Sequence, residues 1–168
     1  MLIDIGANLT HDSFDDDREA VLQRAADAGV NTMIVTGATL EGSRQALQIA
    51  SEYQGLYATA GVHPHHADET TEQTMHELAR LVENDLVLAV GETGLDFFRD
   101  FTPRQDQIRS FEWHMTLAAQ SGLPLFLHER DAYPTFAEVL AKHRGTLGNV
   151  VVHCFTGEAD ALHAYLAL

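Results

Sequence analysis

The chain has 168 residues, of which 45% are hydrophobic and 21% charged, values ordinary for a globular domain with a sizeable core. Its formal charge of −15 argues against an extended grip on duplex nucleic acid, because such binding needs Lys and Arg to neutralise phosphates. No apolar run reaches the roughly 20 residues that cross a bilayer, and the single cysteine excludes an intramolecular disulfide. We therefore expect one domain over 1–168, a reducing cytoplasmic setting and no membrane partner.

Short apolar runs alternate with helical patterns along the chain. The runs that predict strands are 2–7, 32–36, 56–62, 86–92, 125–128 and 149–153. The stretches between them predict helices after Asp12 or Ser13, over 40–53 and 71–83, from about 103 to 121, over 133–143, and from Glu158. Regular alternation of this kind predicts parallel strands with right-handed crossovers.

Two architectures can hold six β/α units. An open doubly wound sheet is one, but no glycine fingerprint follows the first strand and no P-loop is present in the sequence. Ligand-type residues follow many of the strands, which favours a barrel. A complete barrel needs eight units over about 250 residues. We therefore expect an α/β fold, an incomplete (β/α)8 TIM barrel whose C-terminal part is missing.

Three predicted strands end in residues suited to metal binding: Glu92, His128 and His153. A lone buried carboxylate is costly unless it is paired, and a lone histidine is more often a satisfied core residue. Because the carboxyl ends of parallel strands meet at one rim, the three together predict a divalent metal site. The alternatives are Glu92 bonded to backbone amides or to Arg99 or Arg130, and the site of a non-haem iron oxygenase.

Other residues near these strand ends are candidates for phosphate binding. His63 and His65 can bind a phosphate or a metal, or hydrogen-bond their own loop. Arg130 can make a forked contact to phosphate or pair with a nearby aspartate. Asp96, expected in the turn after Glu92, can orient a ligand or a water. Cys154 is expected to point away from the rim.

Five segments of the sequence occur in the order and spacing that are typical of a known family. They are Asp4-Ile5-Gly6-Ala7-Asn8-Leu9-Thr10, Gly61-Val62-His63-Pro64-His65, Gly91-Glu92-Thr93-Gly94-Leu95-Asp96-Phe97, His128-Glu129-Arg130-Asp131-Ala132 and His153-Cys154-Phe155-Thr156-Gly157. Together they resemble the TatD family of metal-dependent deoxyribonucleases. The resemblance implies a (β/α)8 barrel hydrolase that uses Mg²⁺ and digests single-stranded DNA, and some RNA, from the 3′ end.

The resemblance also implies roles for individual residues. These are metal ligation by Glu92, His128 and His153, catalysis by Glu92, His63 and His65, and substrate contacts by Arg130, Asp96 and Asn8. Asn8 and Thr10 stand where many members have a His-x-His pair that holds a second metal. The family's closing Asp, after the seventh or eighth strand, is absent from this sequence.

Several alternatives stay open. Magnesium prefers oxygen ligands, so a site with two histidines favours Mn²⁺ or Zn²⁺ on physical grounds. The same metal cage serves a barrel amidohydrolase or an esterase, for example one acting on aminoacyl-tRNA. An inactive metal-binding fragment is a further alternative. Self-association is expected if the edge strands are uncovered.

Overall fold

The fold is a single sheet of six parallel strands flanked by helices. The computed structural model describes residues 2–168, with the strands in the order β1-β2-β3-β4-β5-β6. The strands are β1 (Leu2–Ala7), β2 (Val30–Val35), β3 (Leu56–Ala60), β4 (Val87–Asp96), β5 (Leu125–Arg130) and β6 (Val150–His153). The helices are α1 (Arg18–Asp27), α2 (Leu40–Glu52), α3 (Glu72–Leu81), α4 (Arg104–Ser121), α5 (Thr135–His143) and α6 (Ala159–Leu166), with short 3-10 turns η1 (Asp12–Phe14), η2 (Pro64–Glu69) and η3 (Arg144–Thr146).

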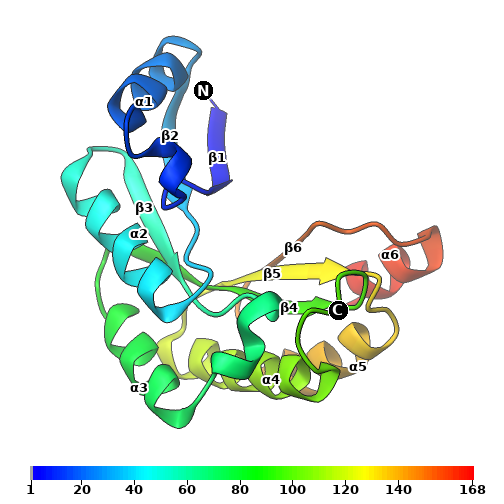
Figure 1. Ribbon diagram of the computed structural model, residues 1–168. Helices are drawn as coiled ribbons and strands as arrows, with labels where there is room; N and C mark the ends of the chain where they lie inside the picture. The colour runs from blue at the N-terminus through cyan, green and yellow to red at the C-terminus, as the bar shows by residue number, and fades with distance from the viewer. Residues whose placement is uncertain (1) are drawn as a thin grey trace.

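The sheet curls instead of lying flat, and α1 to α5 follow its outer side (Figure 1). Sequential strands pair in parallel, as the alternation of strands and helices in the sequence predicted. The predicted incomplete barrel of six units is therefore confirmed. Because all strands run in one direction, their carboxyl ends lie along one rim.

The core lies between the sheet and the outer helices. The apolar positions of α4 that recur at helical spacing, Phe111, Met115 and Ala118, are all buried. Phe111 stacks on Phe136 of α5, with ring centroids 4.9 Å apart. This stacking joins α4 to α5 within the helix layer.

The two outermost strands each pair with one neighbour. Leu2, Ile3 and Ile5 of β1 are exposed, and so is Val151 of β6. Their apolar side chains match the strand pattern of the sequence, but no second layer covers them within residues 2–168. The expected uncovered edges are therefore present.

Strand β4 is longer than the sequence pattern predicted. The prediction ended the strand at Glu92, whereas β4 continues to Asp96 and pairs with β5 along its whole carboxyl end. The register shifts between Gly91 and Thr93, so Glu92 lies on a bulge, and its N–H donates to the Gly37 carbonyl at 2.9 Å. Asp96, expected in a turn, is the last residue of the strand.

Two glycines beside this bulge allow β4 to approach β5 closely. Gly91 has φ 138° and Gly94 has φ 142°, a region that other residues rarely adopt. A Cβ atom on Gly91 would overlap the Phe126 carbonyl oxygen, and one on Gly94 would overlap that of His128. The isolated glycines in this strand were a sequence signal for a bulge.

A buried histidine of α4 supports the segment that carries His63. The Val62 N–H donates to Nε2 of His114 at 3.0 Å, and Nδ1 of the same ring donates to the Ser110 carbonyl at 2.7 Å. The ring is thus neutral, with its proton on Nδ1. Burial lowers the pKa of His114 from 6.5 to about 4, opposed by the bond to Ser110.

This histidine should make the protein less stable in acid. Above pH 6.5 both folded and unfolded His114 are neutral; between pH 6.5 and about 4 only the unfolded chain takes up a proton. The contribution of His114 to the free energy of unfolding should therefore fall across this window by about 3 kcal/mol and level off below it. Urea unfolding at several pH values, compared with His114→Gln, measures the effect. A free-energy difference between the two proteins that does not change with pH would contradict it.

Candidate active site

A pocket of about 570 Å³ opens at the carboxyl ends of the strands. It is lined by residues that lie within or after β1 to β6: Gly6, Asn8, Thr10, His11, Thr36, Ala38, His63, His65, His66, Glu92, Phe126, His128, His153 and Cys154. The lining includes Asn8, His63, His65 and all three residues predicted to bind metal. Residues from Gly6 to Cys154, far apart in sequence, thus meet at one rim, as parallel topology predicts.

One oxygen of Glu92 is the meeting point of three imidazole rings. Oε1 of Glu92 lies 2.7 Å from Nε2 of His153 and 3.1 Å from Nδ1 of His128. Nε2 of His63 is 3.6 Å from the same oxygen. Burial alone would raise the pKa of Glu92, but the hydrogen bonds of His128 and His153 outweigh it and hold that pKa below its ordinary range. Glu92 is therefore a carboxylate at neutral pH.

His128 lies between two carboxylates. Nδ1 faces Glu92 at 3.1 Å, and Nε2 faces Oδ2 of Asp96 at 3.2 Å. A neutral imidazole has one N–H, so one of its nitrogens must turn a lone pair toward a carboxylate oxygen. When Nδ1 carries the proton, it donates to Glu92. When Nε2 carries the proton and donates it to Asp96, the lone pair of Nδ1 becomes available to a cation that Glu92 would also bind.

His63 is held in a defined tautomer. The N–H of His65 donates to Nδ1 of His63 at 3.1 Å, so a neutral His63 carries its proton on Nε2. That nitrogen lies 3.2 Å from Nδ1 of His128. Burial lowers the pKa of His63 to about 3, even though Glu92 opposes the shift. At neutral pH His63 therefore presents an N–H donor to the pocket.

Asp96 lies beneath the rings of His65 and His128. It is 1% exposed, and its Oδ2 is 2.7 Å from Nε2 of His65. Burial raises the pKa of Asp96, but the N–H of Arg99 and the ring of His65 outweigh burial and lower it overall. Contact with two rings of the pocket supports the expectation that Asp96 orients them.

Arg130 and Asn8 differ in their relation to the pocket. Asn8 lines it, directly after β1. Arg130 instead lies over the ring of Phe98, with its guanidinium carbon 4.2 Å from the ring centroid. Within residues 2–168 Arg130 makes no ion pair with Asp96 or Asp131, the alternative that the sequence left open. Its contact with phosphate stays a prediction.

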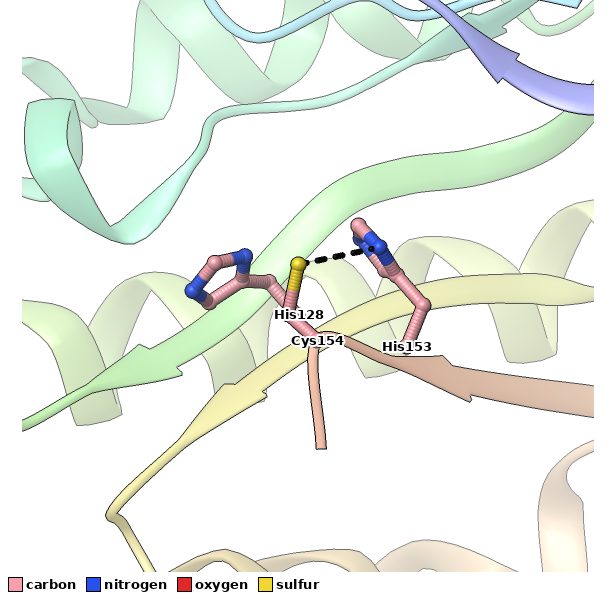
Figure 2. A group of neighbouring side chains, drawn as sticks. All are labelled: His128, His153 and Cys154. Atoms are coloured by element: carbon pink, nitrogen blue, oxygen red, sulfur yellow. Dashed lines mark hydrogen bonds between the residues drawn. The ribbon is translucent and has the colours of Figure 1, made fainter. Parts of the chain in front are cut away.

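Cys154 points into the pocket, contrary to the expectation from strand alternation. Its φ of 56° turns the chain at the end of β6 and brings Sγ to 3.3 Å from Nδ1 of His153 (Figure 2). A regular strand would have placed successive side chains on opposite faces. Ligand atoms of His128, His153 and Cys154 lie within 4.8 Å of one another, as do those of His63, Glu92 and His128.

The donor set of the pocket fits a divalent cation. A buried carboxylate and two imidazole nitrogens are ligands that Mn²⁺ or Zn²⁺ accepts, and neither Lys nor Arg neutralises Glu92 within residues 2–168. Contact between Asp96 and His128 matches the carboxylate–histidine pairs that orient metal ligands. His63 fits ligation less well, because its Nδ1 already accepts a hydrogen bond and its Nε2 carries the proton.

Sequence reasoning did not assign a site role to Phe126. This ring stacks on His153, with centroids 4.4 Å apart and planes 9° from parallel. It lines the pocket and fixes the plane of the imidazole. The sequence did contain a signal for this role: Phe126 stands two residues before His128, so the two side chains share one face of β5.

No helix within residues 2–168 is long and apolar enough to cross a membrane.

Known proteins resemble this chain over almost its whole length. A family described as TatD related DNase matches residues 3–168. The 3'-5' ssDNA/RNA exonuclease TatD of Erwinia billingiae is 44% identical over 167 residues, which are 99% of this chain and 64% of that protein. The chain thus spans about 64% of the length of such relatives.

Solved structures share the fold. YJJV, a TatD homolog from Escherichia coli, has a TM-score of 0.90 and 33% identity, and the match covers 99% of this chain and 64% of the other. A TatD family hydrolase from Entamoeba histolytica has a TM-score of 0.86 and 29% identity, over 99% of this chain and 62% of the other. With the family match over residues 3–168, these findings show that the chain belongs to the TatD related DNase family.

Proposed function

We propose that this protein is a metal-dependent nuclease that hydrolyses phosphodiester bonds of single-stranded DNA, and of RNA, from the 3′ end. The observation that carries the proposal is the meeting of Glu92, His128 and His153 around one carboxylate oxygen in an open pocket. The exonuclease name of the Erwinia billingiae relative supports the choice of substrate.

In this proposal Glu92, His128 and His153 hold the cation. A bound divalent ion would supply Lewis-acid polarisation of the phosphoryl group and acidify a water. Two imidazoles among the ligands favour Mn²⁺ or Zn²⁺ on physical grounds, whereas family resemblance favours Mg²⁺. Asp96 would keep the proton of His128 on Nε2 and so leave Nδ1 free as a ligand.

The remaining residues of the pocket would act on the phosphate. Nε2–H of His63 would donate to a phosphoryl oxygen and stabilise the negative charge that develops there. His65, held by Asp96 at 2.7 Å, and Asn8, which also lines the pocket, would position the end of the nucleic-acid strand. Arg130 would contact a neighbouring phosphate. A few local contacts of this kind suit a chain of net charge −15, which cannot bind a long stretch of phosphate backbone.

A digestion assay tests the proposal. The purified chain would be incubated with single-stranded DNA labelled at the 5′ or the 3′ end, with duplex DNA and with RNA, in Mg²⁺, Mn²⁺ or Zn²⁺. We expect stepwise shortening from the 3′ end of single strands, loss of activity in EDTA and recovery when metal is returned. Cleavage that persists in EDTA, or none with any of the metals, would refute it.

Two further features belong to the same proposal. The exposed apolar edge of β1 supports self-association of this chain through uncovered strands. The exposed free thiol of Cys154 suits a reducing cytoplasmic compartment. Light scattering at rising protein concentration measures this self-association.

A further inference from the structure

Two phenyl rings stand exposed on the loop that follows β4, beside the candidate active site. Phe98 is 55% exposed and Phe101 is 67% exposed. Scattered surface apolar residues are normal, but these two share one short loop at the rim of the pocket. Withdrawing such rings from water is favourable, so stability alone does not account for their exposure.

The loop that presents these rings is fixed by hydrogen bonds. Oδ1 of Asp96 accepts from the N–H groups of Phe98, at 3.1 Å, and Arg99, at 2.8 Å. At the other end, the hydroxyl of Thr102 donates to the Pro64 carbonyl at 2.7 Å, which joins the loop to the turn after His63. An aromatic surface held in this way binds a flat ligand without a cost of ordering the loop.

Both rings adjoin residues that the proposed function places near phosphate. The ring of Phe101 is 4.7 Å from that of His65, between centroids. The guanidinium of Arg130 lies 4.2 Å from the centroid of Phe98, and that of Arg99 lies 5.6 Å from it. Sites for single-stranded nucleic acid combine aromatic rings with such cations, the rings for bases and the cations for the backbone.

We propose that Phe98 and Phe101 form a nucleobase-binding subsite, on which bases beside the scissile phosphate stack. The inference rests on the proposed function and adds the means by which single strands are selected. Bases inside a duplex already stack on one another, whereas those of a single strand have free faces. Stacking tolerates every base, so the subsite would bind without sequence preference.

Single-stranded oligonucleotides with and without bases test this subsite. One carries ordinary bases and the other is abasic with the same length and phosphates; KM and kcat are measured for each. Phe98→Ala and Phe101→Ala should each raise KM for the base-containing strand about tenfold and leave KM for the abasic strand unchanged. Phe98→Tyr and Phe101→Tyr should retain the wild-type KM. Leu166→Ala, which removes a 75% exposed apolar side chain on α6, is the matched control.

A binding measurement separates this inference from the proposed function. Fluorescence anisotropy in EDTA reports the Kd of both oligonucleotides whether or not the chain hydrolyses them. If wild type cleaves neither strand but binds the base-containing one more tightly, and the two alanine variants lose that preference, the subsite stands and the nuclease proposal fails. Two results would overturn the subsite. One is equal affinity of the wild type for the base-containing and the abasic strand. The other is a loss of affinity in the alanine variants that is the same for the two strands.

Discussion

Replacing Glu92 by Gln should lower the rate of phosphodiester hydrolysis on the order of 10³-fold, the scale of losing a principal catalytic group. The carboxamide keeps the shape but removes the charge on which His128 and His153 converge, at 3.1 and 2.7 Å. The affinity for Mn²⁺ should fall as well, because a neutral amide is a poorer ligand than a carboxylate. Oligonucleotide digestion and metal titration by calorimetry measure the two effects.

Glu129→Gln is the matched control for this substitution. Glu129 is also buried, stands next to His128 in sequence, and has a pKa that burial raises. Its Oε1 accepts from the Ala132 N–H outside the pocket. We expect near wild-type activity and metal affinity. Full activity of Glu92→Gln, or equal loss in both variants, would remove Glu92 from its proposed role.

Replacing Gly94 by Ala should cost about 3–5 kcal/mol of the free energy of unfolding, a large part of the roughly 5–15 kcal/mol that a domain possesses. The new Cβ would meet the His128 carbonyl oxygen, and the φ of 142° would be strained as well. The two costs add because both strands are held by their mutual pairing. Urea denaturation followed by circular dichroism measures the loss.

Gly122→Ala separates strain from steric overlap. Gly122 also has a positive φ, 73°, but no atom lies within 4 Å of the position its Cβ would take. The free energy of unfolding of this variant should fall by only about 1 kcal/mol, the cost of a left-handed backbone for alanine. A loss for Gly94→Ala no larger than that of Gly122→Ala would show that β4 can move away from β5.

The sequence predicted the architecture well because the relevant signals are local. Each strand is a short apolar run, and each helix has its own periodicity, so six parallel units followed without knowledge of any long-range contact. The meeting of Glu92, His128 and His153 followed from one general rule, that parallel strands end at one rim. Their roles as ligands stay a prediction, since proximity does not show what they bind.

Features that depend on backbone detail were not predicted from the sequence. The bulge at Glu92 lengthened β4 and moved Asp96 from a turn into the strand, where it contacts His65 and His128. Cys154 turned toward the pocket because its backbone is left-handed, which simple alternation cannot foresee. The orientation of His63 likewise depends on a hydrogen bond, which the backbone N–H of His65 donates to its ring.

The position of Cys154 gives this pocket a built-in chemical handle. It is the single cysteine of the chain, is exposed, and lies 3.3 Å from His153. Burial and the charge of Glu92 raise the pKa of its thiol, so maleimide labelling would be faster in mildly alkaline buffer. A fluorophore attached there would stand at the mouth of the cavity and report occupancy, with no other thiol to engineer away.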